Sequence, residues 1–346
     1  MSDYDALLLV SFGGPEGPDE VMPFLENVLR GKPVPRQRML EVAEHYQHFG
    51  GISPINEQNR RLIAALAADF ASNGLDLPIY WGNRNWHPLL PEALRQMADN
   101  GVKRALAFFT SAFSSYSGCR QYRENIAAAQ ADVGPAAPRV DKLRMFFNHP
   151  GFIEPMVESL RAALRRLPAP NSLDTTVLFT AHSIPLEMAS NCRYELQLTE
   201  ACRLVAEGAG LAAGSWELAY QSRSGSPNQP WLEPDVCDRI EQLHGEGKVQ
   251  QLAIVPIGFI SDHMEVLFDL DTEARELCQR LKIPMQRAAT VGTHPRFVTM
   301  IRELVVERMT GASNRPALGA MGPSHDVCPV DCCLYTPTRP TAAPTG

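Results

Sequence analysis

The sequence predicts an α/β protein with two Rossmann-like domains and a substrate cleft between them. Its length of 346 residues is too great for one ordinary hydrophobic core, so two domains of roughly 150 residues each are expected. Short apolar runs alternate with longer segments of helical periodicity, which is the pattern of parallel strands joined by right-handed crossovers. The helical segments vary in length, which favours two open sheets over one closed barrel.

The apolar runs are predicted to form strands, because each is short, continuous and bounded by glycine, proline or polar residues. These strands are expected at residues 6–12, 79–82, 105–109, 176–181, 218–220 and 252–257. In the segments between and after them, apolar residues recur at helical spacing. Helices are therefore expected at residues 57–71, 89–99, 120–131, 153–166, 195–207, 235–243, 265–281 and 296–309.

The domain boundaries are expected near Asn148 and Gly311. The segment PRVDKLRMFFNHPGF can carry the chain from the first sheet to the second. The prediction is an N-terminal α/β domain of residues 1–148, a C-terminal α/β domain of residues 149–311 and an extension of residues 312–346. The extension is rich in glycine, proline, serine and threonine, and its end, TPTRPTAAPTG, is expected to be unstructured.

Composition and charge exclude several classes of partner. With 32 Lys and Arg against 39 Asp and Glu the net charge is −7, which argues against nucleic acid or an anionic membrane as the main partner. No run of about 18 apolar residues occurs, so no transmembrane segment is expected. The N-terminus is acidic before its first apolar run and lacks the basic region of a signal peptide, so we expect a cytoplasmic protein.

Candidate catalytic side chains follow the predicted strands, because ligands of open parallel sheets bind beyond the carboxyl ends of the strands. His182 ends one apolar run. The loop after a second run and the helix that follows it carry Asp262, His263, Glu265, Asp269 and Glu273. The last three residues are spaced by four, so their carboxylates lie on one helical face.

A purely structural interpretation competes with this one. A lone histidine such as His182 is often a hydrogen-bonded structural residue. Acidic residues at a helix N-terminus complement the helix dipole, which accounts for Glu265 and, less well, for Asp269. It does not account for Glu273, two turns in, where repulsion between like charges costs a few tenths of a kcal/mol per pair. The row is therefore interpreted as a path for a divalent cation or for protons.

Other motifs narrow the choice of ligand. The segment GGPEGP does not match G-x-G-x-x-G, and neither a P-loop nor a G-x-S-x-G elbow occurs, so nucleotide binding and serine hydrolase chemistry are not expected. Aromatic and arginine side chains of the N-terminal half can instead line a cleft for a flat, apolar ligand rimmed by carboxylates. These side chains include Arg30, Tyr46, Tyr116 and Tyr122.

Four motifs together resemble the ferrochelatase family. They are LLLVSFGGP near the start, FGGISPINEQ at 49–58, TAHSIP at 180–185 and PIGFISDHMEVLFDLD at 256–271, and the resemblance covers about residues 4–310. The cysteine-bearing C-terminal extension is most similar to the actinobacterial branch. The resemblance implies two chelatase-type domains with four-stranded parallel sheets flanked by helices. It also implies insertion of ferrous iron into coproporphyrin III in haem biosynthesis, with protoporphyrin IX as the alternative substrate.

The resemblance also implies roles for single residues. His182 falls on the family histidine that accepts pyrrole protons or binds the incoming metal, and we expect it to be neutral near pH 7. Glu265 falls on its partner across the same cleft. The acidic path for protons or iron matches Asp262, His263, Asp269 and Glu273. Porphyrin contacts are implied for Arg30, Tyr46 and Ser53. Several Gram-positive relatives carry a tyrosine where this chain has Phe12, which has no oxygen to offer and is expected to pack on the macrocycle.

The cysteines suggest a second site. The chain has 8 cysteines, and Cys328, Cys332 and Cys333 crowd together near the C-terminus. Three clustered thiols in a reducing compartment point to metal or redox chemistry. The resemblance implies a 2Fe–2S cluster with Cys119 as the fourth ligand and Cys192 as the other candidate. Zinc or free thiols are the alternatives.

One alternative belongs to a different functional class. A tetrapyrrole carrier, or an iron-responsive sensor that uses the Fe–S cluster, needs a cleft but no proton acceptor. Replacing His182 distinguishes such a protein from an enzyme. For the enzyme, the expected partners are coproporphyrin III, ferrous iron and the later enzyme that decarboxylates coprohaem. The chain itself is expected to be a monomer.

Overall fold

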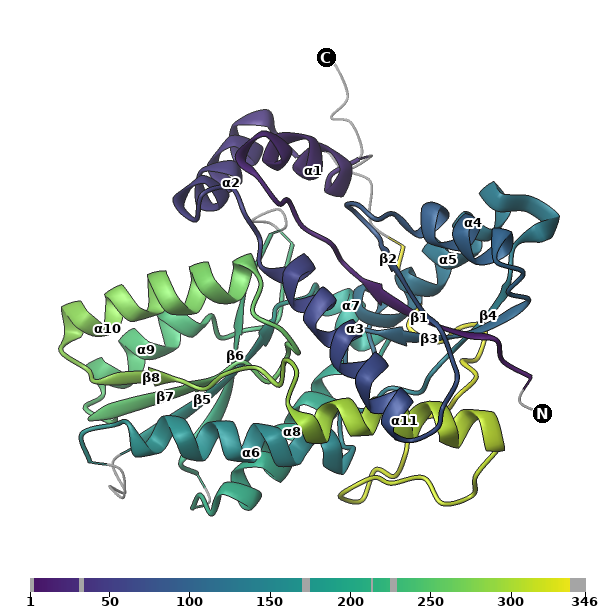
Figure 1. Cartoon of the computed structure of the whole chain (residues 1–346). Coiled ribbons are helices and arrows are strands. Elements are labelled where there is room, and N and C mark those ends of the chain that lie inside the picture. The colour runs from purple at the N-terminus through teal and green to yellow at the C-terminus, as the bar shows by residue number, and fades with distance from the viewer. Residues whose placement is uncertain (1–2, 31–33, 170–174, 213, 225–228, 337–346) are drawn as a thin grey trace.

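Two four-stranded parallel sheets form the framework of the molecule (Figure 1). The computed structural model describes residues 3–30, 34–169, 175–212, 214–224 and 229–336. The strand orders are β2-β1-β3-β4 and β6-β5-β7-β8, and every pairing within them is parallel. The strands are β1 Ala6–Ser11, β2 Ile79–Asn83, β3 Arg104–Phe109, β4 Arg139–Lys142, β5 Thr175–His182, β6 Trp216–Gln221, β7 Gln251–Val255 and β8 Met285–Arg287.

Helices cover both sheets, which confirms the predicted fold class. In the N-terminal half the helical segments are η1 Pro18–Glu20, α1 Val21–Val28, α2 Arg36–His48, α3 Ile55–Ser72, α4 Leu90–Asp99, η2 Tyr116–Arg120, α5 Gln121–Val133 and η3 Gly134–Ala136. In the C-terminal half they are α6 Pro150–Arg165, α7 Leu186–Ser190, α8 Tyr194–Ala209, α9 Val236–Gly245, η4 Val266–Ala274, α10 Arg275–Leu281 and α11 Pro295–Thr310. Among the described residues, no helix is both long enough and apolar enough to cross a membrane.

The central strands are buried on both faces, as their apolar sequences predict. All six residues of β1 and all five of β7 are buried. The two edge strands β4 and β8 were not expected, because they are short and largely polar. The α1–α2 pair was not expected either. It packs around a small core of its own, built on Val21, Phe24, Leu25 and Ala43.

The predicted helix 265–281 begins differently from the expectation. Its first part, η4, is a π-helix, with wider turns than an α-helix, and only α10 is α-helical. Leu267 shares an α-helical spacing with the buried Leu270 and Ala274 but is only partly buried, whereas Val266 is fully buried. The wider turn changes which side chains face the sheet.

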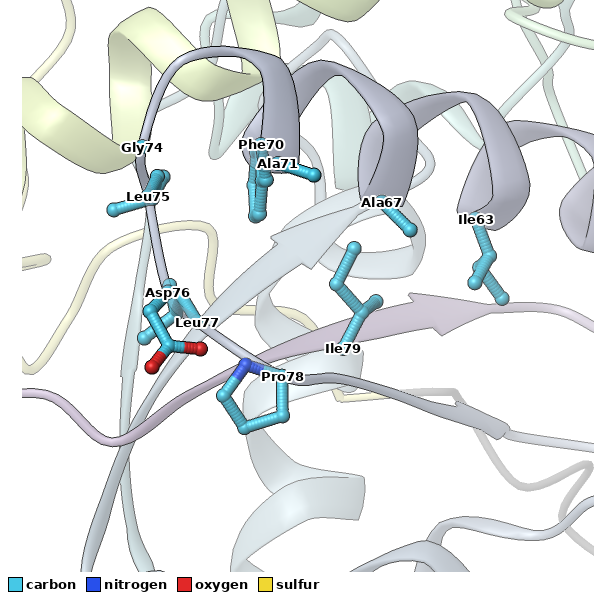
Figure 2. Close-up of a pocket in the computed structure, with 10 residues that line it drawn as sticks. All are labelled: Ile63, Ala67, Phe70, Ala71, Gly74, Leu75, Asp76, Leu77, Pro78 and Ile79. Atoms are coloured by element: carbon cyan, nitrogen blue, oxygen red, sulfur yellow. The ribbon is translucent and has the colours of Figure 1, made fainter.

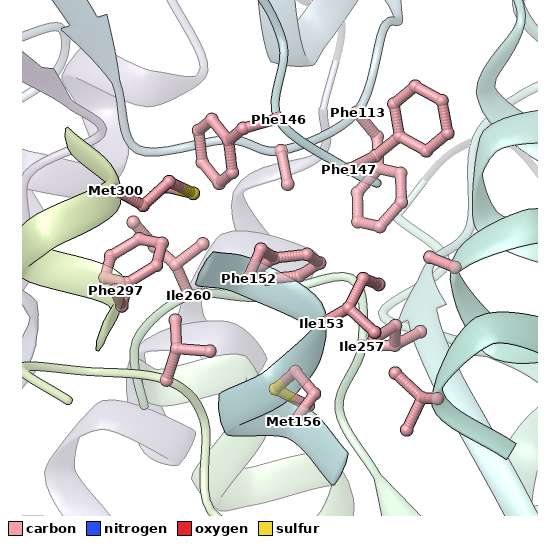
Figure 3. Close-up of a cluster of buried hydrophobic side chains, with 14 of the residues drawn as sticks. Phe113, Phe146, Phe147, Phe152, Ile153, Met156, Ile257, Ile260, Phe297 and Met300 are labelled. Carbon is pink, nitrogen blue, oxygen red and sulfur yellow. The ribbon is translucent and has the colours of Figure 1, made fainter. Parts of the chain in front are cut away.

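One hydrophobic cluster runs through both halves of the molecule (Figure 3). Phe146 from the N-terminal half, Phe152 at the start of α6 and Phe297 on α11 pack ring against ring, with centroids 5.7 to 6.5 Å apart. Helix α11 also packs against α3, although its sequence follows the second sheet. The two sheets therefore share a core. The boundaries 1–148, 149–311 and 312–346 stay a prediction.

Hydrogen bonds attach the C-terminal extension to the N-terminal half of the molecule. Leu318 N–H donates to the backbone oxygen of Asn148 at 2.8 Å, and Asn148 Nδ2 donates to the backbone oxygens of Leu318 and Gly322 at 3.0 and 2.9 Å. Arg120 Nη1 donates to the backbone oxygens of Val330 and Cys332 at 2.8 and 3.0 Å. The unstructured end expected at 336–346 lies, apart from its first residue, outside the described residues.

Candidate functional site

His182 is the last residue of β5, at the carboxyl end of the second sheet. Its Nδ1–H donates to the backbone oxygen of Ser183 at 2.5 Å, which leaves Nε2 to face other groups. Tyr194 donates its hydroxyl to the backbone oxygen of His182 at 3.0 Å. The neighbouring strand β6 places Gln221 in register with His182. The imidazole is thus oriented by the strand and by its own Nδ1 hydrogen bond.

Glu265 lies beside His182 rather than across a cleft from it. Its Oε1 is 3.7 Å from His182 Nε2, and both residues belong to the second sheet and its loops. Glu265 was expected across the cleft from His182, so the structure differs from the expectation here. The loops after β5 and β7 end at the same edge of the sheet, which brings the two groups into contact. His263 Nδ1 lies 4.0 Å from the second oxygen of Glu265.

The contact fixes the charges of the pair. Burial disfavours the imidazolium of His182, but the Glu265 carboxylate outweighs that effect and raises the pKa of His182 to about 9. Burial likewise opposes the carboxylate, but the charge and hydrogen bond of His182 lower the pKa of Glu265 to about 2. The expectation that His182 is neutral near pH 7 is therefore wrong while its imidazole faces the Glu265 carboxylate alone. Both side chains stay accessible to solvent, at 32% and 43%.

Asp269 and Glu273 continue the row from Glu265. Asp269 Oδ2 accepts hydrogen bonds from Ser222 Oγ and from Gln221 Nε2, the latter at 3.1 Å. Burial raises the pKa of Asp269 to about 7, and the charges of Glu265 and Glu273 add to that effect. Glu273 is exposed as a whole residue. Partial burial of its carboxyl group, together with the charge of Asp235, still raises its pKa. The three carboxyl groups are close enough to influence one another's charge.

The other two residues of the predicted acidic path differ in their contacts. Asp262 Oδ1 accepts from Arg287 Nη1 at 3.0 Å and from Thr290 Oγ1 at 3.3 Å, so its carboxylate is held by the C-terminal domain. His263 packs edge-on against Phe259, with ring centroids 4.8 Å apart, and burial lowers its pKa. Asp262 thus has a structural role that the sequence analysis did not foresee.

Side chains of the N-terminal domain approach the pair from another side. Phe12 follows β1 and is 36% exposed, with its ring edge-on to Phe24 at 6.3 Å. Tyr46, on α2, also packs on Phe24, at 5.8 Å. Burial and the charge of Glu265 raise the pKa of Tyr46, so its hydroxyl lies near enough to feel the Glu265 carboxylate. Arg30 is exposed just after α1.

Three further predicted porphyrin contacts are engaged by other residues of the chain, although Ser53 adjoins the loop after β1, where its backbone N–H donates to the backbone oxygen of Pro15 at 2.8 Å. Ser53 is only 4% exposed. Tyr122 is buried beneath the guanidinium of Arg84, which lies 4.6 Å from its ring centroid. Tyr116 packs edge-on against Tyr335 of the C-terminal extension, at 5.6 Å. Arg84 was not predicted; it also lies 5.8 Å from the ring of Phe12, and no motif in the sequence marks it.

The cysteines of the extension meet Cys119. Cys119 hydrogen-bonds to Cys328, and the charges of Cys328 and Cys333 also act on its thiol. Cys332 Sγ lies 3.6 Å from Cys333 Sγ. All 8 cysteines are free thiols, and the four sulfurs predicted as ligands are neighbours. The hydrogen bond from Cys119 and the cations Lys142 and Arg123 hold the pKa of Cys328 below its usual range.

This thiol group fits a cluster held by four thiolates, since nearby cations offset the negative charge. His325 is a neighbour that the sequence analysis missed. The ligand atoms of His325, Cys328 and Cys332 lie within 4.8 Å of one another, which also suits zinc. Cys192 donates its thiol to the backbone oxygen of Met188 at 3.2 Å. Cys119 thus hydrogen-bonds directly to a thiol of the extension, whereas Cys192 influences Cys333 by its charge alone.

Two pockets lie away from the His182–Glu265 pair. One, of about 490 Å³, lies between the end of α3 and the start of β2, with Ile63, Phe70 and Pro78 in its wall (Figure 2). It is at the amino end of β2, opposite the end where parallel sheets bind ligands. The other, of about 520 Å³, adjoins Cys332 and Cys333. The cleft expected between the domains stays a prediction.

A family model described as Ferrochelatase matches residues 4–309. The chain belongs to the ferrochelatase family. This ferrochelatase is 64% identical over 340 residues to a protein of Rhodopirellula baltica named Ferrochelatase, which covers 98% of this chain and 96% of the relative. It is 51% identical over 362 residues to the Coproporphyrin III ferrochelatase of Streptomyces coelicolor, which covers 99% of this chain and 96% of the relative.

Solved structures show the same fold at low identity. The sirohydrochlorin chelatase SirB of Bacillus subtilis subspecies spizizenii, solved in complex with cobalt, matches with a TM-score of 0.52 and 11% identity. The match covers 89% of this chain and 96% of that one. Membership of the ferrochelatase family makes the protein a lyase of haem biosynthesis that inserts iron into a porphyrin, so Fe2+ is a substrate and not a resident cofactor.

Proposed function

We propose that this ferrochelatase inserts Fe2+ into coproporphyrin III and releases coprohaem. The observation that carries the proposal is the His182–Glu265 pair at the carboxyl edge of the second sheet, with its nitrogen and oxygen 3.7 Å apart. Relatives of Streptomyces coelicolor and Streptomyces griseus, each 51% identical, are both named Coproporphyrin III ferrochelatase, which supports this choice of porphyrin. The 64% identical relative is named only Ferrochelatase, so protoporphyrin IX is the second candidate.

The pair supplies what metal insertion needs. Insertion replaces two pyrrole N–H protons by one dication, so the site has to attract Fe2+ and accept protons. Glu265, with a pKa of about 2, is ionised at neutral pH and attracts the cation. The charge of an approaching dication opposes the imidazolium of His182, which is 32% exposed and passes its proton to solvent. The neutral imidazole is then a base for a pyrrole proton. Asp269, with a pKa of about 7, exchanges protons near neutral pH and is the next acceptor along the row.

The porphyrin contacts we propose are Phe12, Tyr46 and Arg30. Phe12 offers an exposed ring at the end of β1, without the oxygen that a tyrosine would present to the metal. Tyr46 brings its hydroxyl from α2 toward Glu265. The exposed guanidinium of Arg30 suits a propionate. The positions of Ser53, Tyr116 and Tyr122 favour structural roles for these residues.

A competition assay tests the choice of porphyrin. Equal concentrations of coproporphyrin III and protoporphyrin IX are supplied with limiting Fe2+ under anaerobic conditions, and the two haems are separated by chromatography. We expect coprohaem to form at least tenfold faster. The His182→Ala variant in the same mixture measures metal insertion that the enzyme does not catalyse. Faster turnover of protoporphyrin IX overturns the substrate assignment, and tight porphyrin binding without insertion indicates a carrier.

We also propose that Cys119, Cys328, Cys332 and Cys333 hold a 2Fe–2S cluster. The mutual contacts of the four thiols support this, as do the cations Lys142 and Arg123 beside Cys328. When bound, such a cluster supplies a one-electron redox centre and a cross-link between the extension and the N-terminal half. Bound zinc at His325, Cys328 and Cys332 is the alternative.

A further inference from the structure

Gln58, in the first turn of α3, makes two hydrogen bonds with one residue of the C-terminal domain. Its Nε2–H donates to the backbone oxygen of Asp262 at 2.6 Å, and its Oε1 accepts from the backbone N–H of Asp262 at 2.9 Å. The side-chain amide thus satisfies both backbone groups of a residue that lies 204 positions away. This pairing joins the two halves of the molecule at a single peptide segment.

The side chain of Asp262, unlike its backbone, is held by residues of the C-terminal domain. Its carboxylate accepts hydrogen bonds from Arg287 and Thr290, and the loop around it is anchored by the buried side chains of Ile260 and Met264. Figure 3 shows Ile260 among the side chains of the interior cluster. Glu265 follows only three residues later. The hydrogen bonds of Gln58 therefore set the position of the N-terminal domain relative to the loop that carries Glu265.

A second contact flanks Glu265 on its other side. The ring of His45, on α2, stacks on Phe268 of η4 with centroids 3.8 Å apart and an interplanar angle of 12°. The N-terminal domain thus touches the Glu265 segment at Asp262 and again at Phe268. Along the chain, Glu265 lies between these two points of contact.

The first turn of α3 also hydrogen-bonds to the loops that follow β1 and β2 in the first sheet. Asn56 is fully buried, and its Nδ2–H group donates to the backbone oxygens of Gly14 and His87, each at 3.2 Å. Gly14 lies two residues beyond Phe12, so this turn connects the loop after β1 with the loop after β7. One helical turn thereby links the loop that carries Phe12, the proposed porphyrin contact, to the loop that carries Glu265.

From these contacts we propose that Gln58 is a positioning residue for metal insertion. By holding Asp262 to the first turn of α3, it sets the distance between the His182–Glu265 pair and the macrocycle bound against the N-terminal domain. The inference rests on the proposed function, because it takes the porphyrin to lie against Phe12. A displacement of about 1 Å at a reacting group can cost up to about a hundredfold in rate.

The test compares Gln58→Met with Gln47→Met. Methionine keeps the length of glutamine but removes the donor and the acceptor. Gln47 is the matched control, since its amide also donates to a backbone oxygen, that of Pro18 at 3.3 Å, but within the N-terminal domain. For Gln58→Met we expect kcat to fall at least tenfold while the Kd for porphyrin, from spectral titration, changes less than threefold. Gln47→Met should match the parent in both.

Hydrogen–deuterium exchange supplies a readout that does not depend on activity. Peptides covering residues 257–268 should exchange at least tenfold faster in Gln58→Met than in the parent, with other peptides unchanged, because the amide of Asp262 loses its acceptor. A kcat within twofold of the parent, unchanged exchange, or an equal loss in Gln47→Met overturns the proposal. If the parent itself inserts no iron, the proposed function fails, while the exchange experiment still tests the Gln58 contact.

Discussion

The protonation of His182 follows from two opposing effects on one side chain. Burial favours the neutral imidazole, whereas the carboxylate of Glu265 at 3.7 Å favours the imidazolium and dominates. The sequence could identify both residues, because each follows a buried strand. It could not give their separation or their charge, which depend on how two loops from distant parts of the chain meet.

His182→Ala should abolish catalysis without abolishing substrate binding. A general base contributes about a hundredfold to ten-thousandfold, so we expect kcat for iron insertion to fall at least about a hundredfold. Porphyrin affinity, measured by fluorescence quenching, should stay within a few-fold of the parent. His244→Ala, at the exposed end of α9, is the matched control and should be fully active. A normal insertion rate in His182→Ala would show that the base has been assigned to the wrong residue.

Glu265→Gln should lower the pKa of His182 from about 9 to below 6.5. With the carboxylate gone, burial becomes the main effect, and burial disfavours the imidazolium. The change can be followed by NMR titration of the imidazole Cε1–H signal. An unchanged pKa would mean that Glu265 does not control His182.

The same pair affects stability in a predictable direction. The raised pKa of His182 stabilises the parent fully below pH 6.5, and this contribution is lost as the pH rises through 9. The lowered pKa of Glu265 stabilises the parent above pH 4.5, and this contribution is lost as the pH falls toward 2. Between pH 6.5 and 9.5 the free energy of unfolding, measured with urea, should therefore fall in the parent more than in Glu265→Gln.

At the scale of elements, the four central strands and the edge strands β2 and β6 were predictable, whereas the edge strands β4 and β8 were not. Six strands were expected from their apolar runs, and the structure has all six. The edge strands β4 and β8 carry charged residues and have no apolar run, so only pairing with a neighbour identifies them. The π-helical start of η4 was also beyond prediction, because a π-turn depends on local packing and has no sequence period of its own in so short a segment.

The described part of the C-terminal extension contains no helix or strand, so its order depends on contacts with the rest of the chain, such as those of Arg120 and Asn148. Cys119→Ser should remove the visible absorption of an Fe–S cluster and lower the iron and sulfide content of anaerobically purified protein to background. Cys237→Ser is the control, since Cys237 is a partly buried thiol on α9, away from the extension. A colourless parent with one zinc ion per chain would instead favour the site that includes His325.

At the scale of the molecule, the two sheets were predicted as separate domains, yet they share one core. The aromatic cluster of Phe146, Phe152 and Phe297 spans the expected boundary at residue 148. The packing of α11 on α3 likewise brings a late helix onto the first sheet. Sequence periodicity predicts each helix but not which sheet it covers. We therefore expect the described chain to unfold as one cooperative unit.

A buried ion pair should contribute strongly to this coupling. Arg144, just after β4, pairs through Nε with Oε1 of Glu307 on α11 at 2.7 Å, with side chains 1% and 8% exposed. Arg144 Nη2 also donates to the backbone oxygen of Pro316, which ties the extension to the same point. Glu307 also pairs with Arg315 Nε at 3.0 Å, so removing Arg144 leaves the carboxylate one cationic partner and costs less than the loss of an entire buried pair.

Arg144→Met should therefore lower the free energy of unfolding by about 1.5–3 kcal/mol in guanidinium titrations, the usual range for hydrogen bonds to a charged group. Arg203→Met is the control, because Arg203 is 39% exposed and pairs within its own helix, with Glu200 and Glu207, where such a pair is worth about 0.3–0.5 kcal/mol. Both the variant and the parent should show one transition by fluorescence and by circular dichroism, since the shared core prevents either sheet from unfolding first. Two separated transitions would mean that the domains are independent despite this contact, and a loss as small as that of Arg203→Met would mean that the buried pair does not couple them.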